Sequence, residues 1–211
     1  MEDVLALYAR PYRPQEPIIS IDEKSKELRS TPRVASRPGR FDYEYRRHGT
    51  RNIFLTCEPK RGWRHAEVTA RRTKRDFALH LRGVMQGRYR HARRVHAIVD
   101  NLNTHSATAV CEALGHDPAR PPRWLRRVRW HYTPKHASWL NAVEAELSVL
   151  GRQCLNRRIA TEDELRRETG AWVRDRNRRR VALDWTFTRQ KAEAKFPSLY
   201  TNGHKTSGAE H

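Results

Sequence analysis

The sequence predicts a single domain of mixed α/β fold. Its 211 residues suit one globular unit with a sizeable core. Apolar runs typical of strands come first along the chain, helical periodicity follows, and one helical stretch lies among the strands. Because 37% of the residues are apolar and six are Trp, the 32% that are charged indicate a charged surface and not a disordered chain.

The early strands are apolar runs between turn residues. Residues 17–21 (PIISI) predict a buried strand that ends at Asp22. Residues 52–57 and 64–70 predict a β-hairpin, because the segment EPKRGW between them contains Pro and Gly. Residues 94–100 (RVHAIVD) predict another strand, which ends at Asp100.

Helices and the last strand follow from periodicity and capping residues. A helical period predicts a helix over residues 73–87, which is interposed among the strands. Ser106 can cap a helix over SATAVCEAL, a Pro-rich basic loop (GHDPARPPRWLRR) follows, and residues 128–132 (VRWHY) predict a fifth strand. Residues 161–180 open with a capping box, Thr161 to Glu164, and become basic toward the end of the helix.

A further helix over residues 138–155 carries two acids on an apolar background. Its expected N-cap is Ser138, and Trp139 is expected to pin it against the sheet. Glu144 and Glu146 flank the apolar stripe on opposite sides, about 160° apart on the helical wheel. Only one of them can therefore face a given site, and periodicity does not decide which.

The charge of the chain indicates a polyanionic partner. Lys and Arg number 43 against 24 Asp and Glu, a net charge of +19, which favours nucleic acid. An anionic membrane could use the same charge, but no run approaches the roughly 18 apolar residues of a spanning helix, and no export signal is visible. Three widely spaced cysteines indicate neither a disulfide framework nor a zinc site. We therefore expect a cytoplasmic protein with reduced core thiols and no membrane partner.

Three acids could form a metal site. Asp22 and Asp100 end two predicted strands, and Glu144 follows the fifth strand. If the first and fourth strands are parallel neighbours, their ends meet at one sheet edge, over which a helix can place a Glu. Such an oxygen-only set suits Mg²⁺ or Mn²⁺ and two-metal phosphodiester chemistry. The alternative is that the three are ordinary surface acids and that Asp100 belongs to a turn.

Other chemistries lack their motifs. The sequence contains no phosphate-binding loop of the G-x-x-x-x-G-K-[ST] type and no nucleophile elbow. His105, His131 and His136 lack the helical spacing or cysteine partners typical of zinc sites, which favours a structural or substrate-contacting role.

Several motifs resemble those of a known family. The segments IDEKSK, RRHGT, VDNLNTHS, HYTPKHASWLNAVEAELSVLGRQCLNRRI and DWTFTRQKAEAKFPSLY are similar to segments of the transposases of the bacterial insertion-sequence 630 family, which are relatives of the mariner elements. The resemblance runs from about residue 1 to residue 201. It implies a ribonuclease-H-like α/β fold, in which a mixed five-stranded sheet is flanked by helices.

The resemblance also implies a site and an activity. Matching motif to motif makes Asp22, Asp100 and Glu144 the catalytic residues and the ligands of two Mg²⁺ or Mn²⁺ ions, with Glu146 a neighbour. The implied activity is DNA strand cleavage and strand transfer in cut-and-paste transposition, in the bacterial cytoplasm at the nucleoid. The alternatives are a catalytically idle, basic DNA-binding remnant and a hydrolytic nuclease of the same fold.

The expected organisation and partners follow from the same match. Residues 1–16 are expected to be an N-terminal linker remnant, 17–200 the catalytic domain and 201–211 a disordered tail. A helix-turn-helix region that reads the element ends is not evident, so double-stranded DNA should be bound with weak sequence selectivity. The expected partners are DNA that carries the element ends, target DNA, a second copy of the chain in a homodimer, and a separate helix-turn-helix subunit. The candidate DNA-binding residues are His105, Arg123, Arg126, Arg127, Lys135 and His136.

Overall fold

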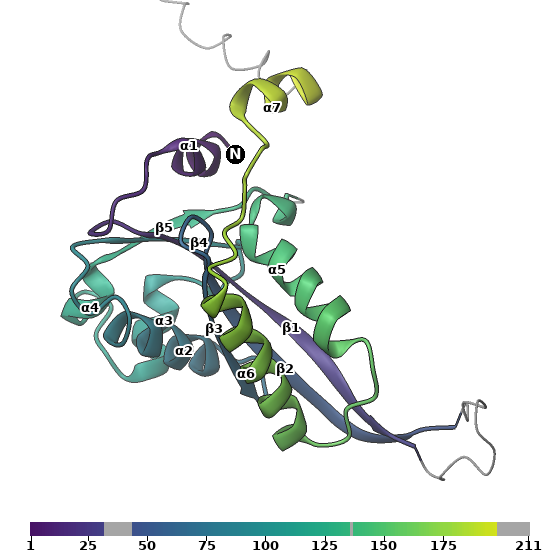
Figure 1. Cartoon of the computed structure of the whole chain (residues 1–211). Helices are drawn as coiled ribbons and strands as arrows, with labels where there is room; N and C mark the ends of the chain where they lie inside the picture. Colours follow the sequence, from purple (N-terminus) through teal and green to yellow (C-terminus); the bar gives the residue numbers. More distant parts are fainter. Residues whose placement is uncertain (32–43, 136, 198–211) are drawn as a thin grey trace, which may run out of the picture.

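A five-stranded sheet lies between two layers of helices (Figure 1). The computed structural model describes residues 1–31, 44–135 and 137–197. The strands are β1 (Ile18–Ser30), β2 (Arg46–Glu58), β3 (Trp63–Thr69), β4 (Val95–Val99) and β5 (Val128–Tyr132). The helices are α1 (Glu2–Ala9), α2 (Lys74–Gln86), α3 (Ala107–Leu114), α4 (Arg123–Arg126), α5 (Ala142–Leu150), α6 (Glu162–Arg178) and α7 (Arg189–Lys195). A 3-10 turn (Ser138–Leu140) precedes α5, and a π turn (Gly151–Leu155) follows it.

The sheet has the order β3-β2-β1-β4-β5 and is mixed. β1, β2 and β3 pair antiparallel, whereas β1, β4 and β5 pair parallel. The prediction that the first and fourth strands are parallel neighbours is therefore confirmed. The parallel ladder joins β1 to β4 only from Ile18 to Ser20, while the antiparallel ladder with β2 continues to Ser30.

The prediction that the first strand ends at Asp22 is wrong. β1 runs on beyond β4 because its backbone groups still pair with β2, where Asp22 lies opposite Leu55. Beyond Asp22 most of its side chains are partly or fully exposed, which suits a ribbon of two strands. The polar residues from Asp22 onward, which were expected to end the strand, belong instead to this two-stranded ribbon.

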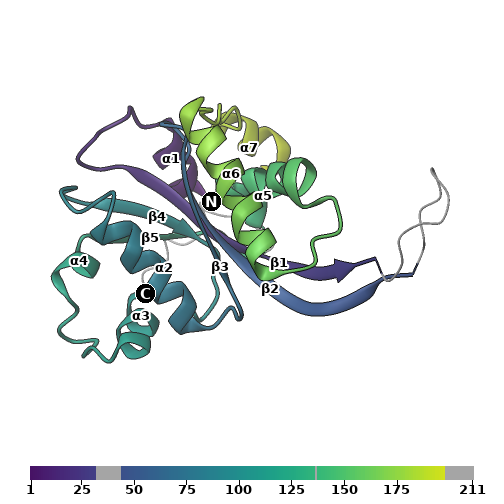
Figure 2. The same cartoon turned by 60° about the horizontal axis from the view of Figure 1, so that its bottom comes forward.

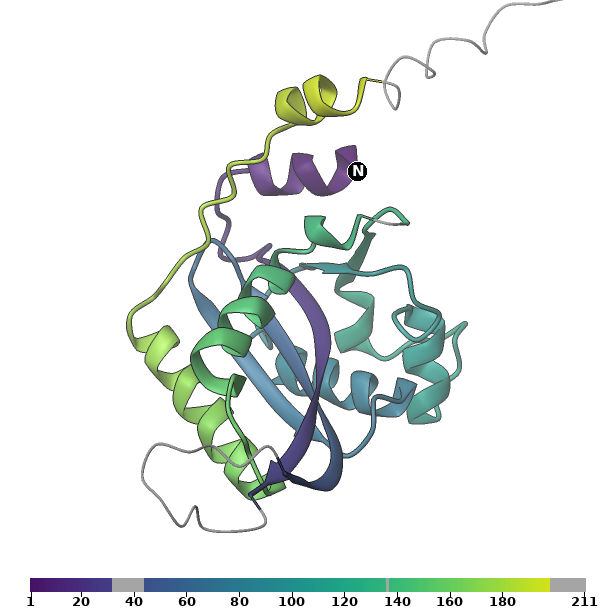
Figure 3. The same cartoon turned by 90° about the vertical axis from the view of Figure 1, so that its right-hand side faces the viewer.

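Each face of the sheet is covered by its own helices, as Figures 2 and 3 show. α2, α3 and α4 cover one face, where Phe54 and Phe77 belong to the core. α5 and α6 cover the other face, where Leu55 packs with Val143 and Trp172. Neighbours on β2 thus point to opposite cores, which explains why every residue of the strand from Asn52 to Glu58 is buried.

α1 and α7 lie side by side at one end of the molecule (Figure 3). Tyr8 of α1 stacks on Trp185, with 4.4 Å between the ring centroids, and Glu2 pairs with Arg189 at 3.3 Å. Residues 1–16, expected to be a linker, thus include a helix whose apolar side is buried. The expected tail, 201–211, lies outside the described residues.

The predicted caps are largely present. Thr73 caps α2 in a capping box, Ser106 caps α3, and Thr161 caps α6. α5 differs, because its N-cap is Asn141 and not Ser138, which begins the 3-10 turn. The basic loop after α3 contains the short helix α4, which sequence analysis did not predict.

Trp139 does not pin the helix against the sheet, so that prediction is wrong. Trp139 is 41% exposed, and its ring meets the ring of Phe187 edge to face, with 4.9 Å between the centroids. Phe187 belongs to the C-terminal segment. The three cysteines, Cys57, Cys111 and Cys154, are buried and free, in agreement with their prediction as core thiols. Within the described ranges, no helix combines the length and the apolar character needed to cross a membrane.

Candidate active site

Asp22 lies on β1 just past the point where the strand leaves β4. Its side chain is only 9% exposed, and its Oδ1 accepts a hydrogen bond from the backbone N–H of Glu23 at 2.8 Å. The pKa of Asp22 is raised to about 7, chiefly by burial; the hydrogen bond from Glu23 opposes the rise, and the negative charges of Glu144, Asp100 and Glu23 add to it. This carboxyl group is thus buried among other acids.

Asp100 is the first residue after β4, and a buried histidine holds it. The Oδ1 of Asp100 contacts Nδ1 of His105, whose ring is packed against Phe77 with 4.2 Å between centroids. The backbone N–H of Thr133 donates to the carbonyl of Val99 at 3.0 Å, which extends the β4–β5 pairing up to this point. Asp100 is therefore fixed both by its strand and by its side-chain partner.

Glu144 lies in the first turn of α5, and two side chains anchor that end of the helix. Nδ2 of Asn141 donates to the carbonyl of Ile21 at 3.1 Å, which ties the helix to β1 next to Asp22. The hydroxyl of Tyr8 accepts from the N–H of Ala142 and donates to the carbonyl of Leu140, both at 3.0 Å. Glu144 thus lies in the first turn of α5, because the helix begins at Ala142 and not directly after the expected cap Ser138, and its placement depends on α1.

Glu23 is an acid at this site that sequence analysis missed. Its side chain is 8% exposed, and its Oε2 makes no hydrogen bond but lies 3.6 Å from Nε2 of His105. Burial raises the pKa of Glu23, the positive charge available on His105 opposes the rise, and the charge of Asp100 adds to it. Its position beside Asp22 in the segment IDEKSK was the available signal.

The three predicted residues are thus brought together from β1, the end of β4 and the start of α5. Their carboxylate oxygens do not all lie within 4.8 Å of one another. In the described part of the chain, the group of His, Cys, Asp or Glu side chains that meets this criterion is His65, Glu67 and His80, which lies elsewhere.

Glu146 faces away from this site and is fully buried. Its two oxygens accept from Nε and Nη2 of Arg64 at 2.6 and 2.7 Å, and Arg176 donates to it at 2.9 Å. The two acids of α5 therefore lie on opposite sides, as the helical wheel predicted, and Glu146 joins β3 to α6.

The basic candidates have different surroundings. Lys135, Arg123 and Arg126 are exposed, and His136 lies outside the described residues. Nη1 of Arg127 donates to the carbonyls of three residues of the loop before β4, so this side chain holds the loop in place. His105 is buried against Asp100, so it can contact a bound substrate only through the acid cluster.

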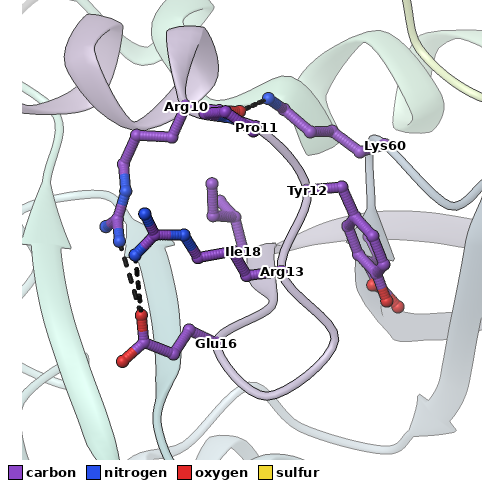
Figure 4. Close-up of a pocket in the computed structure, with 8 residues that line it drawn as sticks. Arg10, Pro11, Tyr12, Arg13, Glu16, Ile18 and Lys60 are labelled. Carbon is purple, nitrogen blue, oxygen red and sulfur yellow. Dashed lines mark hydrogen bonds and ion pairs between the residues drawn. The ribbon is translucent and has the colours of Figure 1, made fainter.

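A second group of basic residues surrounds Glu16, which precedes β1 and so lies at the opposite end of the parallel strands from Asp100. Figure 4 shows Arg10 and Arg13 directed at the Glu16 carboxylate, with Lys60 bonded to the carbonyl of Arg10. Arg93 and Arg94 also pair with Glu16. Four arginines share one carboxylate, so this group keeps an excess of positive charge.

The acid cluster fits hard divalent cations. Its donors are carboxylate oxygens, the ligands that Mg²⁺ and Mn²⁺ prefer, and the buried Oε2 of Glu23 has no hydrogen-bond donor of its own. Burial raises the pKa of Asp22 most, and the nearby charges of Glu144 and Asp100 add to the rise, so a cation placed among these carboxylates would favour their ionised forms. Asp22, Asp100 and Glu144 are the residues that would hold such ions.

Comparison with known proteins gives a consistent result. A family model described as DDE superfamily endonuclease matches residues 17–166. Among curated proteins, none matches the chain. Solved structures do: the catalytic domain of Mos1 mariner transposase is 16% identical, with a TM-score of 0.54 over 83% of this chain and 79% of that one.

Two larger assemblies are also similar. A pre-cleavage Mos1 transpososome is 14% identical, and a Mos1 mariner paired end complex with Mn is 16% identical, each with a TM-score of 0.56. Each match covers 98% of this chain but only 61% of the other. At such identities the likeness establishes the fold, which is the expected ribonuclease-H-like mixed sheet with flanking helices.

Proposed function

Because the chain belongs to the DDE superfamily endonucleases, whose members are generally phosphoryl transferases, we propose that it is the catalytic domain of a transposase that cuts and joins DNA strands. The finer assignment to the insertion-sequence 630 family rests on the sequence motifs quoted above. The chain spans 61% of the Mos1 transpososome protein, so the activity of a whole transposase, with its end recognition and assembly, is part of this proposal.

One observation carries the proposal. Asp22, Asp100 and Glu144 come from three distant parts of the chain, and the charges of the other two raise the pKa of Asp22. Like charges held close together oppose folding, and carboxyl groups with perturbed pKa values concentrate at functional sites. Asp100 follows the C-terminal end of the parallel strand β4, and such strand ends are where ligands bind in open α/β folds.

The residues of the chain would divide the work as follows. Asp22, Asp100 and Glu144 would hold two Mg²⁺ or Mn²⁺ ions, which when bound supply charge stabilisation to the oxygens of a phosphodiester undergoing displacement. His105 orients the Asp100 carboxylate, and Asn141 keeps the start of α5 against β1. Exposed cations such as Lys135 and Arg72 would attract and position the DNA backbone.

The test is incubation of the purified chain with Mn²⁺ and a DNA duplex that contains an element end, with both nicked and joined products scored. Glu144→Gln keeps the shape of the side chain but removes its charge, so it should abolish both products and leave DNA binding nearly unchanged. Glu112→Gln, on the exposed part of α3, is the matched control and should retain full activity.

The outcomes separate the three candidate functions. Nicks and joined products that both require Glu144 support a transposase. Nicks without joining indicate a hydrolytic nuclease of the same fold. DNA binding without either product, with Mn²⁺ and with Mg²⁺, indicates an idle remnant.

A further inference from the structure

A second group of potential metal ligands lies away from the acid cluster, between β3 and α2. His65 and Glu67 are next-but-one neighbours on β3, so they point to the same face of the sheet, and His80 faces them from α2. Their ligand atoms all lie within 4.8 Å of one another. Figure 2 shows β3 and α2 adjacent on this side of the molecule.

The spacing of these atoms matches a metal site. Nε2 of His65 lies 3.1 Å from Oε1 of Glu67, and Nδ1 of His80 lies 3.4 Å from Oε2 of the same carboxylate. Two ligands at about 2.0–2.1 Å from one tetrahedral Zn²⁺ are about 3.4 Å apart. Only small side-chain rotations would be needed to place a cation among the three groups.

His80 is held as a metal-binding histidine usually is. Its Nε2 is hydrogen-bonded to the hydroxyl of Thr56 at 2.7 Å, and its ring stacks on Phe54 with 5.7 Å between centroids. Histidine ligands commonly use one ring nitrogen for such a supporting bond and the other for the metal. The Thr56 contact therefore leaves Nδ1 directed at Glu67.

That Nδ1 has no hydrogen-bond partner although His80 is completely buried. A buried polar atom with no partner is costly, and native structures normally avoid it. The atom faces a carboxylate at 3.4 Å without forming a hydrogen bond of good geometry. A cation bound between the imidazole and the carboxylate would satisfy both groups.

We propose that His65, Glu67 and His80 form a site for a late first-row divalent cation, with Zn²⁺ the best match. Two imidazoles and one carboxylate suit zinc, whereas Mg²⁺ prefers an all-oxygen set. The side chains of His65 and Glu67 are 38% and 37% exposed, so the ion can enter from solvent and keep a position open to water. The bound ion would join the edge strand β3 to α2.

The test is a Zn²⁺ titration of the full chain in excess Mg²⁺, which occupies carboxylate sites. His65→Ala and Glu67→Gln each remove one ligand from a partly exposed position, so both variants should fold. Each should lower the affinity by about 100-fold or more, and the wild type should bind one more ion than either variant. Exposed His116→Ala is the matched control and should bind like the wild type.

Two further measurements tie binding to this geometry. Thr56→Val replaces the supporting hydroxyl by a methyl group and should weaken Zn²⁺ binding by about 10- to 100-fold. Co²⁺ in place of Zn²⁺ should give visible absorption bands in the wild type that are missing in His65→Ala. Equal Zn²⁺ affinity and stoichiometry in the wild type and both ligand variants, or no binding to the wild type, would overturn the proposal.

Discussion

Two glutamates two positions apart on α5 have opposite environments. Glu144 faces the acids of β1 and β4, where its charge raises the pKa of Asp22, whereas Glu146 is paired with Arg64 in the interior. One helix thus contributes to a site with surplus negative charge on one side and to a balanced ion pair on the other. Substitution of each residue should therefore change a different property.

Glu146→Gln should destabilise the protein strongly. The side chain of Arg64 is 1% exposed, and loss of the carboxylate would leave its charge buried without a counterion. Removal of one partner from a buried pair costs about 3–5 kcal/mol, which thermal or urea unfolding would measure. Below its lower Tm the variant should still cut DNA, and loss of cleavage in a variant shown to be folded would contradict this assignment.

Asp22 should make the metal-free protein less stable as the pH rises. Its pKa is about 7 in the folded chain, against about 3.9 when unfolded, so its ionisation opposes folding. The contribution of protonated Asp22 to the free energy of unfolding is therefore fully present below about pH 4. It is lost as the pH rises from about 4 to about 7. At pH 8 with a chelator, Asp22→Asn should be more stable than the wild type, by up to ~4 kcal/mol. An equal difference in Tm at pH 4 and at pH 8 would refute this explanation.

At the scale of elements, α1 helps to build the site although it contributes no acid. The Tyr8 hydroxyl bridges the 3-10 turn and the first residue of α5, and it also lies 3.3 Å from Oγ of Ser20 on β1. Helix α1 therefore connects the strand that carries Asp22 to the helix that carries Glu144.

Tyr8→Phe should weaken both the fold and the site. The change leaves the N–H of Ala142 and the carbonyl of Leu140 without their buried partner, at a cost of about 1–3 kcal/mol. The start of α5 should loosen, so Mn²⁺-dependent cleavage should fall more than DNA binding. Tyr12→Phe, at a partly exposed ring, serves as the control. Unchanged Tm and cleavage in Tyr8→Phe would show that α1 does not support the site.

Periodicity and capping residues predicted most elements because those signals are local. The strand over residues 128–132 and the caps at Thr73, Ser106 and Thr161 appear as expected. The errors occur where tertiary contacts decide. β1 continues past Asp22 because β2 pairs with it, and α1 is stable because its apolar side packs against distant segments.

The site shows the same difference between local sequence signals and tertiary contacts. Motifs pointed to Asp22, Asp100 and Glu144, and the topology brings them near one another. The ion pair of Glu146 with Arg64 could not be predicted, because it joins α5 to a strand far away in sequence. The His65, Glu67 and His80 group was missed for the same reason, because it joins β3 to α2, whereas Glu23 had a local signal in its position beside Asp22.

At the scale of the whole molecule, a net charge of +19 surrounds a local acid cluster. The positive charge draws a polyanion toward the surface, while the acids require cations before a phosphate can approach them closely. The Glu16 group, at the opposite end of the parallel strands, shows that basic residues are not confined to the neighbourhood of the acids.

Binding to duplex DNA should accordingly be steeply salt-dependent and weakly selective. Each phosphate neutralised contributes about −0.9 to the slope of log K against log salt, so six or more contacts would weaken binding by at least ~1,000-fold between 50 and 200 mM salt. The measurement is a titration of end-containing and scrambled duplexes at both salt concentrations. Equal affinity at the two concentrations would contradict the electrostatic explanation, and strong preference for the end sequence would indicate a reading element in this chain.

The dual pairing of β1 also determines the order in which the protein can fold. Its long antiparallel ladder with β2 joins segments that are close in sequence, so the entropy cost of closing that loop is small. The short parallel ladder with β4 and the docking of α5 join distant segments, and each step brings carboxylates closer together. We therefore expect the acid cluster to assemble last. Nascent or partly folded chains would then hold no working nuclease site, and divalent cations would act on the final folding step.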